Sequence, residues 1–162
     1  MTTISRSLNR TEENARKRAA WLALYGGVFV FAGKAVAYMA TDSTAILSDA
    51  LESIVNVVTA TFLVYSIRLA ATPADRNHPY GHGKIEFFAA GVEGTLIVVA
   101  GAVILVAALQ AFILGSKVHS IGLGIQLLIG FTVINGIIGW RLVWVGTQLN
   151  SVALRADGLH LL

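Results

Sequence analysis

Long apolar segments constrain the fold of this chain more than any other feature. Four of them follow one another, at residues 19–40, 44–70, 85–114 and 121–148. Each is long enough to cross a hydrocarbon core of about 30 Å as a helix. Lipid offers the backbone no hydrogen-bond partner, so a helix is the structure in which such a segment satisfies its own peptide groups. The sequence therefore predicts an all-α membrane protein with four complete transmembrane helices.

Composition agrees with this class and excludes others. Hydrophobic residues make up 56% of the chain and charged residues 13%, far from the balance of a soluble domain. There is no cysteine, which excludes disulfides and thiolate metal sites. The net charge of +3 is better explained by membrane topology than by nucleic-acid binding. No nucleophile with a placed general base is recognisable, so we do not expect an enzyme.

The connections between the segments predict hairpins and an orientation. Residues 41–43 and 114–120 are short and join antiparallel neighbours, whereas residues 71–83 carry Pro73 and Pro79, which bar a regular helix there. Lys and Arg concentrate in the tail of residues 1–18, around the 71–83 loop and after the fourth segment, while Lys117 is nearly alone on the other side. The positive-inside rule places the N-terminal tail and this loop in the cytoplasm, with a bacterial inner membrane as the expected location.

A fifth helix is expected to begin near Asn150, but the sequence ends at Leu162. About a dozen residues, at a rise of about 1.5 Å each, cannot span a bilayer. We therefore expect residues 19–162 to form a transmembrane domain that is cut within its fifth helix. A re-entrant or interfacial segment is the alternative.

Polar residues form a stripe within the second apolar segment. Asp49, Glu52 and Asn56 fall at i, i+3 and i+7, which places them on one side of a helix. Ionisable groups inside a membrane are costly and usually face a cavity with a functional role. Two acids and an amide are hard ligands that suit a cation. A polar seam between two helices is the other interpretation, and the stripe by itself favours neither.

A similar pattern occurs in the fifth segment, where Asp157 lies three residues before His160. A neutral imidazole together with carboxylates suits zinc and its neighbours among the metals. Taken alone, His160 also fits a core or interfacial histidine that makes one hydrogen bond.

The loop between the second and third segments holds Asp75, His78 and His82. These side chains could supply three of the four ligands that zinc takes. A structural turn is the alternative. A metalloprotease motif is excluded, because Pro79 and Gly81 interrupt the spacing and no glutamate follows the first histidine.

Three stretches together resemble the cation diffusion facilitator family. They are residues 45–56 (AILSDALESIVN), 75–86 (DRNHPYGHGKIE) and 155–160 (RADGLH), and the resemblance extends over residues 15–162. It implies the N-terminal part of a six-helix transporter, usually dimeric, that exports divalent metals in exchange for protons. Helix six and the usual cytoplasmic C-terminal domain are absent from this sequence.

The resemblance also implies which residues bind metal. The transport site would include Glu52, Asn56 and His160, with a fourth ligand four residues after His160, past the end of this sequence. A cytoplasmic loop site would be formed by Asp75, His78 and His82. Asp49 and Asp157 would then be outer-sphere groups, proton-path groups or helix-packing partners.

The sequence departs from the family at two ligands. Family members commonly have His or Asp at the position of Glu52, and Asp at that of Asn56. Asn in place of Asp removes a negative charge from the expected metal site. Zinc is the first metal expected, and iron, cobalt, cadmium and manganese are the alternatives. The function expected is divalent cation efflux by proton antiport. The alternative is a membrane interaction or regulatory subunit that keeps the fold without transporting.

Overall fold

The structure, a computed structural model, describes residues 3–41, 44–114 and 121–162, and all regular structure in these ranges is α-helical. The elements are α1 (Thr3–Thr41), α2 (Thr44–Ala70), α3 (Ile85–Leu114), α4 (Ile121–Gln148) and α5 (Val152–His160). The all-α fold with four long apolar helices and a short fifth is confirmed. The predicted segments 44–70, 85–114 and 121–148 coincide with α2, α3 and α4.

The first helix is longer than its apolar segment. The polar residues from Thr3 onward continue directly into the span, so the described part of the N-terminal segment is helical. The short turns expected at residues 41–43 and 114–120 lie mostly outside the described residues. The loop of residues 71–84 contains no regular helix, as its two prolines require.

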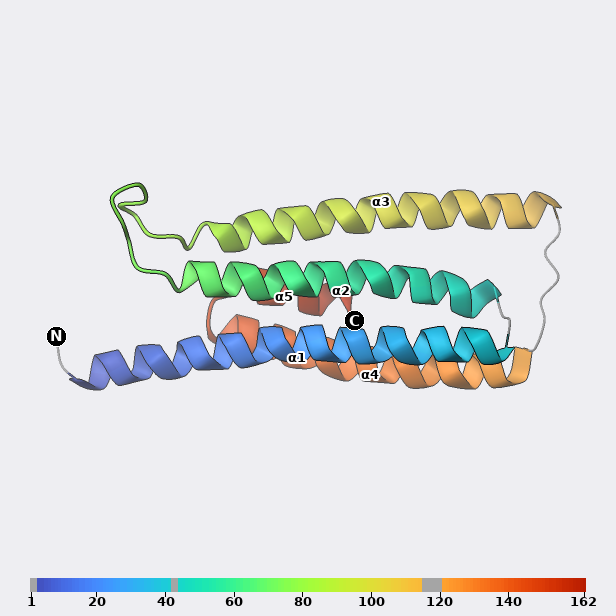
Figure 1. Ribbon diagram of the computed structural model, residues 1–162, viewed down its shortest axis with the longest axis horizontal. Helices are drawn as coiled ribbons and strands as arrows, with labels where there is room; N and C mark the ends of the chain where they lie inside the picture. Colours follow the sequence, from blue (N-terminus) through green and yellow to red (C-terminus); the bar gives the residue numbers. More distant parts are fainter. Residues whose placement is uncertain (1–2, 42–43, 115–120) are drawn as a thin grey trace.

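The four long helices run side by side along the longest axis of the molecule, and each runs antiparallel to the next in sequence (Figure 1). Helix α1 packs mainly against α2 and α4, whereas α3 lies at one side of the bundle and contacts α2 and α5. The short α5 turns back along the bundle, so that the C-terminal residue lies near its middle (Figure 1).

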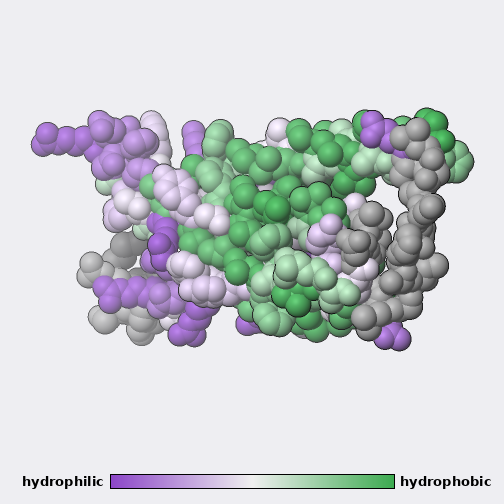
Figure 2. Space-filling model, turned by 45° about the vertical axis from the view of Figure 1, so that its right-hand side comes forward, coloured by the Kyte–Doolittle hydropathy of each residue, from purple (hydrophilic) through white to green (hydrophobic). Residues whose placement is uncertain are grey.

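The surface has the polarity expected of a membrane protein. Figure 2 shows a broad apolar region over the middle of the helices and hydrophilic residues gathered at one end. Four helical stretches in the described chain are long and apolar enough to cross a membrane, namely Arg10–Thr41, Ile46–Ala70, Ile85–Gln110 and Ile125–Gln148. We call the end that holds residues 71–84 and the α4–α5 connection the basic end.

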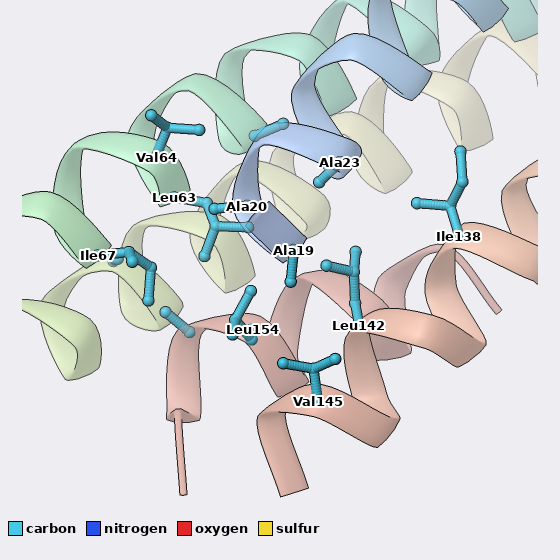
Figure 3. Packing of buried hydrophobic residues seen from close by; sticks show 13 residues of the cluster. Ala19, Ala20, Ala23, Leu63, Val64, Ile67, Ile138, Leu142, Val145 and Leu154 are labelled. Carbon is cyan, nitrogen blue, oxygen red and sulfur yellow. The ribbon is translucent and has the colours of Figure 1, made fainter. Parts of the chain in front are cut away.

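The core lies where α1, α2, α4 and α5 meet, toward the basic end (Figure 3). Small side chains on α1 (Ala19, Ala20 and Ala23) face larger ones on α2 and α5, including Leu63 and Leu154. Lipid tails are as apolar as these residues, so close packing rather than water exclusion favours the association of the helices. Small residues permit that close approach, and the packing fixes where α5 lies relative to α2.

Candidate metal sites

The intramembrane site is built on the middle of α2. Glu52 and Asn56 lie one turn apart on this helix, and both side chains are partly exposed within the bundle. The Nε2 atom of His160, on α5, lies 2.9 Å from the Oδ1 atom of Asn56. The charge of Glu52 also lies within electrostatic reach of the His160 imidazole. The fold therefore brings together residues that are 104 positions apart in the chain.

The start of α5 is held by a buried polar network. Ser151 caps α5, because the backbone N–H of Leu154 donates to its hydroxyl, and the same hydroxyl donates to Glu86 at the start of α3. Arg16 of α1 forms an ion pair of 3.0 Å with Glu86 and also donates to the carbonyl of Leu149. Charged hydrogen bonds of this kind are the stronger class in proteins. The network ties α5, and hence His160, to two other helices.

A backbone turn next to this network reverses the chain between α4 and α5. Asn150 has a φ of 50°, in the left-handed region that asparagine tolerates better than most residues. The N–H of Ser151 donates to the carbonyl of Gly146 at 2.8 Å, which closes the turn. Because this connection is short, α5 packs against α4 directly after the turn.

Asp49 and Asp157 each have polar partners other than Glu52 and His160. Asp49 forms an ion pair with Lys34 of α1, with 2.9 Å between Oδ1 and Nζ. Asp157 is buried, and its Oδ1 atom lies 3.5 Å from the hydroxyl of Thr59, which makes a shorter bond of 3.0 Å to the carbonyl of Asn56. Both acids thus face neighbouring helices, next to the site rather than within it.

Glu93 is a buried acid that lies outside every sequence motif described above. It lies on α3 and interacts with Asp157 across the α3–α5 contact, and the Oε1 atom of Glu93 and the Oδ2 atom of Asp157 lack hydrogen-bond partners. Buried polar atoms are nearly always paired, so this carboxyl pair is unusual. An acid within the apolar segment 85–114 was the signal that could have found it.

The three loop residues Asp75, His78 and His82 lie close together in the structure. The ligand atoms of Asp75, His78 and His82 all lie within 4.8 Å of one another. The Nδ1 atom of His78 lies 3.2 Å from Asp75 Oδ1, and the Nε2 atom of His82 lies 3.7 Å from Asp75 Oδ2. Backbone N–H groups of His78 and Asn77 donate to the Asp75 carboxylate. The bond from the His78 N–H is the main cause that lowers the pKa of Asp75, so this carboxylate stays ionised and able to accept a cation.

Interior polar groups on packed apolar helices define the class first: an α-helical membrane protein with ionisable groups inside its helical bundle. The comparison with known families then gives the family. Residues 20–162 match the cation efflux transmembrane domain, and the chain belongs to the cation efflux family. It is a multi-pass membrane protein of a transporter family and not an enzyme, as the sequence indicated.

Individual relatives agree with this assignment. An uncharacterised transporter of Synechocystis is 45% identical over 126 residues, which are 78% of this chain and 41% of that protein. The manganese efflux system protein MneP of Bacillus subtilis is 30% identical over 65% of this chain and 36% of its own length. The cation-efflux pump FieF of Salmonella typhi is 31% identical over 94% of this chain and 51% of its own. The chain thus spans about half or less of the length of these relatives.

Proposed function

We propose that the protein exports a divalent metal cation from the cytoplasm in exchange for protons, and that Glu52, Asn56 and His160 bind the metal during transport. The observation that carries the proposal is the contact of 2.9 Å between His160 and Asn56 in the bundle interior. Two ligand-type atoms from different helices already adjoin there, with a carboxylate one turn away. Membership in the cation efflux family supports the same activity.

The ligand set bears on the choice of metal. An imidazole, a carboxylate and an amide oxygen form a borderline set that suits zinc, iron, cobalt, cadmium or manganese. Zinc is the first candidate, because it readily takes nitrogen and oxygen ligands in a four-coordinate site. Manganese gains support from the relative named as a manganese efflux protein.

Proton exchange follows from the histidine. An imidazole binds a metal only through its deprotonated nitrogen, so a proton and a metal compete for His160. Protons that reach the site from outside the cell would displace the metal outward. Rocking of helix groups around the site would supply alternating access.

The direct test is Glu52→Ala in the full gene product, reconstituted in proteoliposomes with a metal-sensitive dye. We expect pH-gradient-dependent zinc flux to fall to the level of empty liposomes, because the site loses its charged ligand. The matched control is Glu12→Ala, an exposed acid outside the apolar segment. Full transport by Glu52→Ala would refute the assigned site.

The loop is proposed as a second, cytoplasmic metal site. The three ligand atoms lie within 4.8 Å of one another, and small movements would bring them to the zinc distance of about 2.0–2.2 Å from a shared ion. Calorimetry on His78→Ala/His82→Ala should show one fewer zinc per protomer than the parent protein. An unchanged stoichiometry would leave these residues the role of a structural turn.

The complete transporter is expected to be a homodimer in the inner membrane, with the basic end in the cytoplasm. Crosslinking in membranes would report the dimer. The orientation follows from the distribution of Lys and Arg.

A further inference from the structure

Lys34 is a charged residue inside the α1 span that the transport site does not explain. Its side chain is nearly completely buried, at 3% exposure for the residue. A lysine in such a place requires partners for its charge and its donors, because burial without them is costly. In the described part of the chain, the ion-pair and hydrogen-bond partners of the Lys34 ammonium lie on α2.

Those partners are arranged around the ammonium group. The Nζ atom lies 2.9 Å from Asp49 Oδ1, 2.8 Å from Ser53 Oγ and 3.4 Å from the carbonyl oxygen of Asp49. Ser53 donates its own proton to that carbonyl at 3.0 Å, so its oxygen is free to accept from Lys34. The three donors of the ammonium group therefore each have an acceptor.

The position of this ion pair connects it to the metal site. Asp49 lies one turn before Glu52 on the same stripe of α2, and Ser53 is the neighbour of Glu52 in the chain. The Asp49 side chain keeps 30% of its surface exposed, so the ion pair does not enclose the carboxylate completely. Without Lys34, the stripe would present two adjacent carboxylates to an approaching cation.

We propose that Lys34 is a tethered counter-cation that sets the charge of the transport site by neutralising Asp49. With the pair intact, Glu52 is the one uncompensated acid of the stripe. A dication then binds weakly enough to be released during each transport cycle. Lys34 is then a positioning residue that controls the affinity of the site for the metal through Asp49. This inference rests on the proposed transport function.

The proposal predicts effects of opposite sign for the two partners. Lys34→Gln leaves the negative charge of Asp49 beside the site, which should tighten zinc binding on the order of tenfold and slow turnover, lowering KM and kcat together. Asp49→Asn leaves the positive charge of Lys34, which should weaken binding to a similar degree. The double variant should return to the affinity of the parent, and Lys34→Arg should stay close to it.

A purely structural ion pair behaves differently. Loss of either partner would then destabilise the protein and weaken binding in the same direction. Ser53→Ala serves as the matched control, because it removes a hydrogen bond to Lys34 and leaves both charges in place. We expect its zinc affinity to stay within about twofold of the parent, since a neutral bond adds no charge to the site.

The experiment is calorimetric titration with zinc alone, at one fixed pH, on the purified full gene product and these variants, followed by flux in proteoliposomes. Opposite shifts for Lys34→Gln and Asp49→Asn, cancelled in the double variant, support the proposal. Shifts in the same direction overturn it. Should Lys34→Gln not fold, equal affinities for Asp49→Asn and the double variant would overturn it as well. A parent protein without Glu52-dependent zinc binding would instead refute the transport function itself.

Discussion

Asn56 stands where the family resemblance implies an aspartate. The expected metal site therefore has one negative charge fewer. The Oδ1 atom of Asn56 lies 2.9 Å from the Nε2 atom of His160. Because an amide oxygen only accepts, a hydrogen bond here requires the imidazole tautomer that carries its proton on Nε2. A metal could replace that proton between the two side chains. The amide then offers one oxygen ligand without charge, and a dication gains less electrostatic stabilisation than it would from a carboxylate.

The variant Asn56→Asp tests this role. The two side chains have nearly the same shape, so the change adds one negative charge in the same place. We expect zinc to bind on the order of tenfold more tightly, because a charge beside a dication in the partly shielded interior contributes about 1 kcal/mol or more. Calorimetry at one fixed pH measures the shift. Asn56→Leu, which removes the oxygen, should weaken binding. Equal affinities for all three proteins would exclude Asn56 as a ligand.

Spacing along a helix predicted the stripe of α2 but not the partners of its members. Asp49, Glu52 and Asn56 do share one side of the helix, as the intervals require. Asp49 nevertheless turns to Lys34, and this depends on how α1 is rotated and shifted against α2. The same limit applies to Glu93, whose neighbour Asp157 is 64 positions later in the chain by residue number. Periodicity contains no information on the register between helices.

At the scale of elements, a close crossing of α4 and α5 positions His160. A Cβ atom added at Gly158 would lie 2.7 Å from the backbone nitrogen of Val143 and 2.8 Å from the carbonyl of Gly139. One added at Gly139 would lie 2.7 Å from the carbonyl of Gly158. The two helices thus touch backbone to backbone, which glycine permits. The chain has 16 glycines, and their frequency in the sequence does not reveal which of them form the contact.

Gly158→Ala should therefore displace α5. The added methyl group would collide with backbone atoms, which cannot rotate away as a side chain can. We therefore expect the free energy of unfolding to fall by about 1–3 kcal/mol. We also expect weaker zinc binding, because His160 would move away from Asn56. Thermal unfolding in detergent and calorimetry measure the two effects. Gly91→Ala is the control, because nothing lies within 4 Å of its added Cβ atom. A Gly158→Ala protein as stable as this control would show that α5 tolerates a wider spacing.

At the scale of the whole molecule, the basic end of the bundle combines positive charges with aromatic contacts. The basic end holds Arg16, Arg68, Arg76 and Lys84. The guanidinium of Arg68 lies 4.9 Å from the ring centroid of Trp21, and that of Arg141 lies 4.6 Å from that of Trp144. Tryptophan with a basic partner is typical of the membrane–water boundary, where one part of the pair is apolar and the other polar. These contacts fit a membrane–water boundary at this end of the bundle, and the Lys and Arg distribution alone predicts that this end faces the cytoplasm.

This orientation gives the last prediction. These 162 residues contain no cysteine, so a single thiol introduced among them reports its own position within this part of the protein. Asn77→Cys lies in the exposed 71–84 loop, and Ser43→Cys lies in the sequence between α1 and α2, just before the second apolar segment begins. In intact cells, a membrane-impermeant thiol reagent should label Ser43→Cys and not Asn77→Cys, because the positive-inside rule keeps the basic end in the cytoplasm. Permeabilised cells should label both and so control for reactivity. Labelling of Asn77→Cys in intact cells would invert the orientation, and the proposed loop metal site would then face the outside of the cell.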